Sequence, residues 1–171
     1  MSKLRIMECF GGIAACSKAL ERLGIEYEIA DYVEIDKYAV KSFNAMHSTN
    51  FEPQDICEWD KDIEVDLIIG GFPCQDISLA GKQEGIIKGV TRSGLMYEMM
   101  RVIHKLKPKY VIAENVKNIL SNKFIPQLKE YLCFLNDNGY EVTMDILNAK
   151  DYGIPQNRER IFIIGVKNED I

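Results

Sequence analysis

The chain has 171 residues, of which 47% are hydrophobic and 27% are charged, a balance typical of one globular domain with its own core. The formal net charge of −5 argues against nucleic-acid binding through a basic surface on this chain alone. The five cysteines include no Cys-x-x-Cys or His-Cys cluster, which argues against a disulfide framework and a metal site. Because no apolar run reaches the about 20 residues of a membrane span and no signal peptide is evident, the expected location is the cytoplasm.

The chain opens with an apolar segment, a turn of small residues and a helical pattern. Residues 4–10 are predicted to form a strand, residues 11–15 a turn, and the following helix is predicted to end at Gly24. Strand, small-residue turn and helix are the first unit of a nucleotide-binding α/β fold, in which the turn lies close to the ligand. A glycine-rich turn by itself fits plain helix–strand packing equally well.

Carboxylates follow the second predicted strand, residues 27–33. Glu34 lies about 20 residues after the glycine turn, where Rossmann-like folds bind ribose hydroxyl groups. Asp36 fits the N-cap of a helix over residues 38–46, so Glu34 is the better ligand candidate. A short third strand is predicted to end near Asp55, which would bring that carboxylate to the same sheet edge.

A single cysteine follows a fourth predicted strand, the apolar run at residues 65–69. Gly70 and Gly71 end this run, and Pro73 restricts the backbone before Cys74. The thiol therefore lies on a constrained loop at the carboxyl edge of a parallel sheet, where such sheets bind ligands. On this stretch alone, a nucleophile and a buried structural cysteine remain equally good interpretations.

The remaining elements complete one domain over residues 1–171. A glycine-containing basic loop over residues 79–92 fits a lid beside the thiol. A helix to Leu106 precedes a fifth strand, which delivers Glu114 to the edge that holds Cys74. After a helix over residues 124–135, the segments 140–147 and 161–166 are predicted to pair as an antiparallel hairpin. The expected fold is an α/β sheet of about seven strands, five of them parallel.

Six short motifs, in order along nearly the whole chain, resemble those of the DNA cytosine-5 methyltransferases. They are Phe10-Gly11-Gly12-Ile13, Glu34-Ile35, Asp55-Ile56, Gly71-Phe72-Pro73-Cys74-Gln75, Glu114-Asn115-Val116 and Gln156-Asn157-Arg158-Glu159-Arg160. The resemblance implies a Rossmann-like methyltransferase fold that binds S-adenosyl-L-methionine. The cofactor contacts that we expect are Phe10, Gly12, Ile13, Glu34, Ile35, Asp55, Ile56, Pro73 and Leu95.

The resemblance also implies a catalytic role for four residues. Cys74 would add to carbon 6 of cytosine, and Glu114 would act as an acid at ring N3. Arg160, together with Arg158, would hold the cytosine carbonyl oxygen or a phosphate oxygen. The target cytosine of DNA would be flipped into the pocket, and the loop over residues 79–92 would close on it.

The sequence also departs from the family pattern. Ala14 and Ala15 stand where many members have two glycines, and Phe72 replaces a proline. The larger departure is that no target-recognition region and no C-terminal helix follow the last strand. A split gene with a second polypeptide, a truncated sequence and a non-catalytic remnant all remain open. One sheet face should be partly uncovered, which predicts self-association or poor solubility of the isolated chain.

The expected function is methyl transfer from S-adenosylmethionine to carbon 5 of cytosine in DNA through a covalent Cys74 adduct. Two alternatives remain. One is a non-catalytic module that binds the cofactor or a partner, and the other is part of an RNA cytosine-5 methyltransferase. By family analogy, the expected setting is restriction–modification or phage self-protection.

Overall fold

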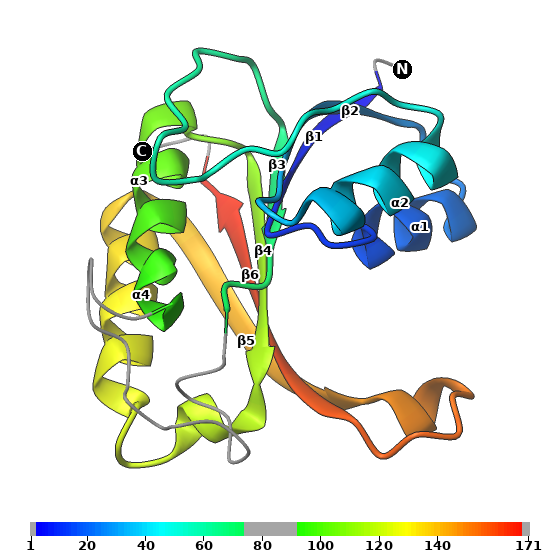
Figure 1. Cartoon of the computed structure of the whole chain (residues 1–171). Coiled ribbons are helices and arrows are strands. Elements are labelled where there is room, and N and C mark those ends of the chain that lie inside the picture. The colour runs from blue at the N-terminus through cyan, green and yellow to red at the C-terminus, as the bar shows by residue number, and fades with distance from the viewer. Residues whose placement is uncertain (1–2, 74–91, 169–171) are drawn as a thin grey trace.

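The computed structural model describes residues 3–73 and 92–168, which form a mixed six-stranded sheet with helices on both faces (Figure 1). The strand order is β2-β1-β3-β4-β6-β5. The first four strands are parallel: β1 (Leu4–Cys9), β2 (Tyr27–Val33), β3 (Leu67–Gly70) and β4 (Tyr110–Val116). The last two form an antiparallel hairpin that pairs with β4: β5 (Tyr140–Asn148) and β6 (Glu159–Lys167). The Rossmann-like α/β class and the terminal hairpin are confirmed.

Two layers of helices cover the sheet. One face carries α1 (Ala15–Arg22) and α2 (Lys37–His47), and the other carries α3 (Met96–Leu106) and α4 (Ile125–Asp137) (Figure 1). Three short 3₁₀ helices complete the described elements: η1 (Arg92–Leu95), η2 (Lys117–Leu120) and η3 (Ala149–Tyr152). Asp36 caps α2 as predicted, because its carboxylate accepts hydrogen bonds from Tyr38 N at 2.7 Å and Ala39 N at 3.2 Å.

The third predicted strand, ending near Asp55, is not formed, and the described residues 48–66 contain no strand. This segment turns instead, with Glu58 N donating to Asp55 O at 3.1 Å. The Asp55 side chain also accepts a hydrogen bond from Cys57 N at 2.9 Å. An aspartate that bonds the backbone two residues on favours a turn over a strand, so the sheet has four parallel strands where five were expected.

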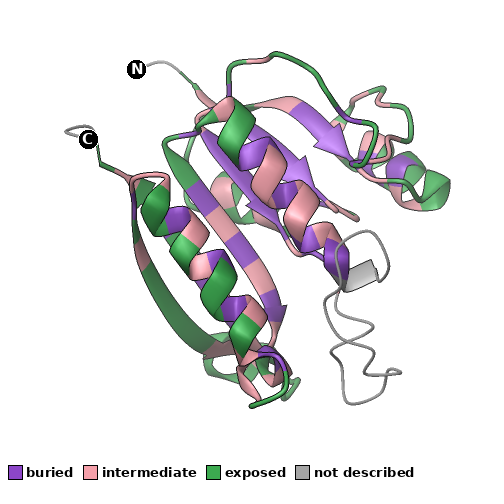
Figure 2. Ribbon diagram, turned by 90° about the vertical axis from the view of Figure 1, so that its left-hand side faces the viewer, coloured by how far each residue is buried: buried purple, intermediate pink, exposed green. Residues whose placement is uncertain are grey.

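The larger part of the core lies between the sheet and the α3–α4 layer. Alternate residues of β4 and β6 point into it, and Val111, Ala113, Ile161 and Ile163 are almost fully buried. Figure 2 shows buried and exposed positions alternating along the helices of this layer. This period of burial follows from the amphipathic patterns predicted for these segments.

On the opposite face, the helices cover only part of the sheet. Ile112 of β4 packs with the apolar side chains beneath α1, and its partner on β6 is Ile164. Further along the sheet, Tyr110, Ile164 and Val166 stay 41%, 41% and 42% exposed. This agrees with the expected partly uncovered face, and self-association through it stays a prediction. None of the helices in the described part of the chain is long and apolar enough to cross a membrane.

Candidate active site

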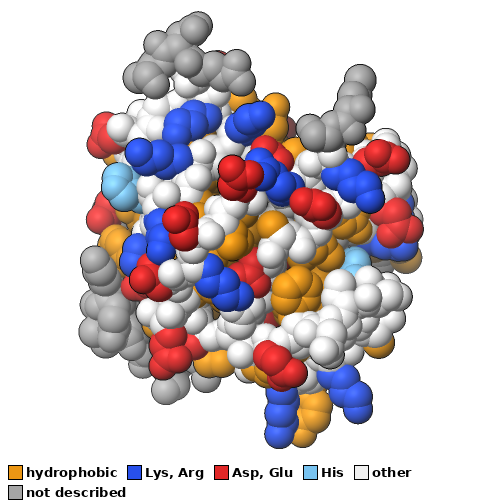
Figure 3. Space-filling view, turned by 90° about the horizontal axis from the view of Figure 1, so that it is seen from above, with side chains coloured by type: hydrophobic (Ala, Val, Ile, Leu, Met, Phe, Trp, Pro, Cys, Tyr) orange, Lys and Arg blue, Asp and Glu red, His pale blue; other side chains and the backbone are white. Residues whose placement is uncertain are grey.

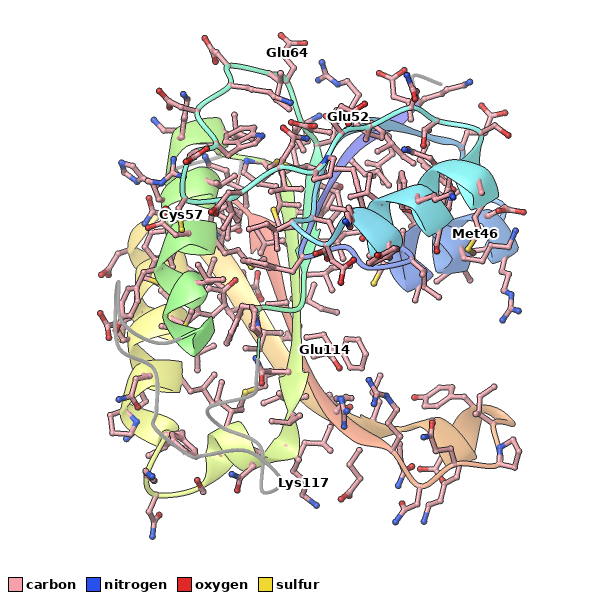
Figure 4. All side chains as sticks on the ribbon, viewed as in Figure 1. Met46, Glu52, Cys57, Glu64, Glu114 and Lys117 are labelled. Atoms are coloured by element: carbon pink, nitrogen blue, oxygen red, sulfur yellow. The ribbon has the colours of Figure 1, made fainter. Side chains whose placement is uncertain are left out.

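A cavity of about 550 Å³ lies at the carboxyl edge of the parallel strands. Its walls include the turn after β1, Gly70 and Gly71 at the end of β3, the carboxyl end of β4 and the β5–β6 hairpin. Among the predicted site residues, Phe10, Glu114, Arg158 and Arg160 line it. Figure 4 shows Glu114 beside β4, between the α1–α2 layer and the projecting end of the β5–β6 hairpin. The topology therefore brings residues that are far apart in sequence to one edge, as predicted for an open α/β sheet.

Glu114 and two arginines form the charged part of this cavity. Arg160 Nε lies 2.9 Å from Glu114 Oε1, and Arg158 Nη2 lies 4.0 Å from the same oxygen. The Glu114 and Arg160 side chains are 31% and 22% exposed, so both remain accessible to a ligand. A Cβ atom at Gly71 would lie 3.0 Å from Glu114 Oε2. The absence of a side chain at Gly71 therefore lets the chain before Cys74 pass close to this carboxylate.

Asn115, the next residue of β4, points to the opposite face and is buried. Its Nδ2 donates to Phe72 O at 3.2 Å, and its Oδ1 accepts a hydrogen bond from Val116 N at 2.8 Å. Asn115 thus ties the Gly-Gly-Phe-Pro segment to β4, a role that the sequence did not reveal although the residue lies in a recognised motif. Cys74 itself and most of the predicted 79–92 loop lie outside the described residues.

The predicted cofactor turn follows β1 and has an unusual backbone. Phe10, Gly12 and Ala14 have φ angles of 54°, 54° and 57°, all in the left-handed region. Gly12 N donates to Glu34 Oε2 at 3.1 Å, and the Tyr32 hydroxyl donates to Gly12 O at 2.6 Å. The structure therefore brings Glu34 to the turn, as predicted. Alanine in the left-handed region is about 1–2 kcal/mol less favourable than glycine, so Ala14 has a local energetic cost that a glycine at this position would not have.

The other predicted cofactor residues differ in how accessible they are. Ile13 and Ile35 are 54% and 66% exposed, so both offer apolar surface to a ligand. Ile56 is only 3% exposed and packs in the larger core, so any ligand contact there falls mainly to its backbone. Asp55, Pro73 and Leu95 are partly buried. The ligand contacts of all these residues stay predictions.

The opposite, amino edge of the sheet has a different character. Figure 3 shows acidic and basic side chains interspersed over this edge. Arg5 pairs with Asp66 and Glu64 there, and Lys109 lies 4.0 Å from Asp66. Charges that neutralise one another in this way form no single-sign surface, so the carboxyl edge is the better candidate for ligand binding.

The family model for C-5 cytosine-specific DNA methylases matches residues 4–171. The chain belongs to this family. Among the relatives of this methylase chain, the orphan methyltransferase M.Rho11sI of Bacillus phage rho11s is 39% identical over 173 residues, covering 99% of the chain and 34% of that protein. The type II methyltransferase M.NlaX of Neisseria lactamica is 36% identical over 169 residues, covering 98% of the chain and 53% of that protein.

Solved structures agree with this assignment. A DNA modification methyltransferase encoded within an E. coli prophage superimposes with a TM-score of 0.79 at 27% identity, over 96% of the chain and 47% of that structure. The Dnmt2 methyltransferase of S. pombe gives a TM-score of 0.76 at 21% identity, which shows a shared fold, over 97% of the chain and 50% of that structure. The methylase chain thus spans between a third and about half the length of these proteins.

Glu8, at the end of β1, is a cavity residue of the methylase chain that the sequence reasoning missed. Its carboxylate is 3% exposed and accepts hydrogen bonds from Ser17 N, at 3.0 Å, and from the Ser17 hydroxyl group. The N-cap residue of α1, Ala14, has no side-chain hydrogen bond, so Glu8 caps this helix from the neighbouring strand. Burial raises the pKa of Glu8, although the bonds from Ser17 oppose this shift.

The raised pKa of Glu8 predicts how stability depends on pH. The folded chain holds the Glu8 proton more tightly than the unfolded chain, so this group's contribution is complete at low pH and is lost as pH rises through the folded pKa. Glu8→Gln resembles the protonated form and should raise the free energy of unfolding at pH 7 by about 1 kcal/mol. Urea unfolding at several pH values would measure this gain, which should vanish well below the unfolded-state pKa of about 4.3, where both states are protonated. A Gln variant that is less stable at pH 7 would contradict the prediction.

Proposed function

We propose that this chain is the catalytic and cofactor-binding part of an enzyme that methylates carbon 5 of cytosine in DNA, with S-adenosylmethionine as methyl donor. The observation that carries the proposal is the placement of the Glu114–Arg160 pair in a cavity at the sheet edge reached by the segment before Cys74. The chain's membership of the methylase family supports the same reaction.

The residues around the β1 turn fit the proposed cofactor. The Glu34 carboxylate accepts one hydrogen bond at each oxygen, from Gly12 N and from Asp36 N, so each oxygen keeps acceptor capacity for a ribose hydroxyl group. The exposed Ile13 and Ile35 offer apolar contact to an adenine ring. When bound, S-adenosylmethionine would supply an electrophilic methyl group.

The chain's own groups would then make the cytosine reactive. The Cys74 thiolate would add to carbon 6, which breaks the 5,6 double bond and places negative charge on the ring. Glu114 would deliver a proton to N3, which neutralises this charge and leaves an enamine that reacts at carbon 5. Arg160 would donate to the carbonyl oxygen at position 2 and hold the base against Glu114. After carbon 5 has accepted the methyl group, loss of its proton to solvent and elimination of the Cys74 thiolate would restore the aromatic ring, and N3 would return its proton to Glu114.

We infer that the choice of DNA sequence resides outside these 171 residues. The relatives named above are two to three times longer, and the net charge of −5 leaves most of the expected attraction to DNA to another region. This region would be a second polypeptide or the rest of a longer protein. The isolated chain should accordingly bind DNA weakly and without sequence preference.

Trapping with 5-fluorocytosine tests the reaction. Fluorine on carbon 5 prevents the final proton loss, so the thioether to Cys74 would persist through denaturation. The chain should be mixed with S-adenosylmethionine and a duplex in which 5-fluorocytosine faces a mismatched base, because a mismatch lowers the penalty for base flipping. Peptide mass spectrometry should find the Cys74 peptide attached to the nucleotide. A duplex with ordinary cytosine is the control.

Two other outcomes of this experiment point to different functions. A chain that binds the cofactor but forms no adduct would be a non-catalytic module. An adduct with 5-fluorocytosine in RNA but not in DNA would change the substrate class.

A further inference from the structure

Asp31 carries a buried charge that the proposed reaction does not use. It lies near the end of β2 and is only 2% exposed. Four donors surround its carboxylate: Tyr32 N at 2.9 Å and Gln54 Nε2 at 2.9 Å on Oδ1, and Trp59 Nε1 at 2.7 Å and Lys61 Nζ at 2.8 Å on Oδ2. Burial tends to raise the pKa of Asp31, but these hydrogen bonds outweigh it and lower the pKa, so the group is ionised at neutral pH.

A bulge in β2 aims this carboxylate. The β1–β2 register shifts between Ile6 and Met7, so that Ile6 pairs with Ile29 and Met7 pairs with Asp31. Ala30 is therefore an extra residue, and the normal alternation of side chains is reversed beyond it. Tyr32 consequently packs on the same side as Ile29, beneath α2, and Asp31 faces the opposite side. Without the bulge, Asp31 would point toward the apolar cluster under the helices.

The side-chain donors to Asp31 all come from residues 54–61, a segment without helix or strand that contains Asp55 and Ile56. Gln54 adds a bond from its Nε2 to Tyr32 O of β2 at 2.7 Å and one from its backbone N to Glu34 O, just after β2, at 2.9 Å. On the α3 side, Arg101 Nη2 donates to Ile56 O at 2.7 Å. Polar side-chain contacts therefore set where this segment lies relative to Glu34.

We propose that Asp31 is a positioning residue of the cofactor pocket, which holds Asp55 and Ile56 opposite Glu34 without touching the ligand. The inference rests on the proposed function, because Glu34 and the Asp55–Ile56 pair act together only if an adenosine lies between them. Loss of the Asp31 charge leaves the buried Trp59 N–H and the Gln54 amide with a weaker acceptor, so the segment should loosen where the adenine would lie.

Asp31→Asn keeps the shape of the side chain and removes the charge, and Asp66→Asn is a matched control. Asp66 is also largely buried, accepts hydrogen bonds from Arg5 N at 2.9 Å and Arg5 Nε at 3.2 Å, and has a lowered pKa, but it lies at the amino edge. Two ligands separate positioning from general destabilisation: S-adenosylhomocysteine and S-inosylhomocysteine, which differ in the base. Trp59, the only tryptophan in the sequence, reports on the segment by its fluorescence.

In calorimetric titrations, Asp31→Asn should weaken the binding of S-adenosylhomocysteine about 10-fold and the binding of S-inosylhomocysteine clearly less, so that the selectivity for adenine falls. Acrylamide quenching of Trp59 should rise. Asp66→Asn should change neither the selectivity nor the quenching, even if it lowers the melting temperature as much. Equal weakening of both ligands by Asp31→Asn, or unchanged quenching, would overturn the proposal.

A second variant covers the case in which Asp31→Asn does not fold. Gln54→Ala removes one donor to Asp31 and the bond to Tyr32 O, while Trp59 and Lys61 stay paired. Like Asp31→Asn, this variant should reduce the base selectivity and increase the quenching of Trp59. Unchanged values would overturn the proposal. Failure of the wild-type chain to bind either ligand would contradict the proposed function instead, and the quenching comparison would still decide whether Asp31 holds the segment.

Discussion

Cys74→Ala is expected to abolish methyl transfer, with a loss of more than about 10⁴-fold in rate. Alanine cannot add to carbon 6, and without this addition carbon 5 of cytosine is too poor a nucleophile to accept the methyl group. The measurement is transfer of a radiolabelled methyl group to the mismatched duplex described above, at saturating cofactor. The 5-fluorocytosine adduct should disappear in parallel, whereas affinity for S-adenosylhomocysteine should stay within about 3-fold of wild type.

Cys133→Ala is the matched control for this variant. Cys133 is exposed on α4, on the sheet face away from the cavity, so its loss should leave both transfer and adduct formation unchanged. If the adduct persists in Cys74→Ala and is lost in Cys133→Ala, the nucleophile is Cys133 and our assignment of Cys74 is wrong.

Glu114→Gln should reduce the rate of methyl transfer by about 10²–10⁴-fold. Glutamine preserves the size of the side chain and can accept the hydrogen bond from Arg160, which is 2.9 Å from the carboxylate in the native protein. It cannot deliver a proton to N3, so the negative charge that forms on the ring stays uncompensated. Single-turnover kinetics would separate this chemical step from DNA binding.

The control for Glu114→Gln is Glu159→Gln on the neighbouring strand. Glu159 also forms an ion pair, but its partner is Lys117 at 2.9 Å, and it does not line the cavity that contains Glu114. Its replacement should leave the single-turnover rate within about 3-fold of wild type, in line with the small contribution of exposed ion pairs. A normal rate in Glu114→Gln would remove Glu114 from the proposed chemistry.

The sequence predicted the features of the fold that follow from local pattern. The strand that ends at Gly70, the strand that delivers Glu114 and the terminal hairpin were all recognisable from apolar runs and turn residues, and all are present. The prediction of a third strand ending near Asp55 was wrong, because the hydrogen bond from Cys57 N to the Asp55 side chain favours a turn there.

The sequence also predicted part of the candidate site. Since parallel strands end at one edge, the strand pattern indicated that Glu114 would lie at the ligand-binding edge. The family resemblance added Phe10 and Arg160 to the same site, and all three line one cavity. The sequence did not reveal the roles of Glu8, Asn115 and Asp31, each of which has a hydrogen bond to a residue between 9 and 43 positions away. A buried acid or amide has no local signature, because its partners are chosen by the packing of distant segments.

By itself, then, the sequence determined the α/β class, the family and the groups available for chemistry, because apolar runs, turn residues and motif spacing are local properties. The tertiary structure alone decided how these groups are held. The bulge at Ala30 aims Asp31 at Trp59, the bare backbone of Gly71 admits the Glu114 carboxylate, and the core takes up the side chain of Ile56. Each of these depends on register and close packing between segments, which the one-dimensional pattern does not encode.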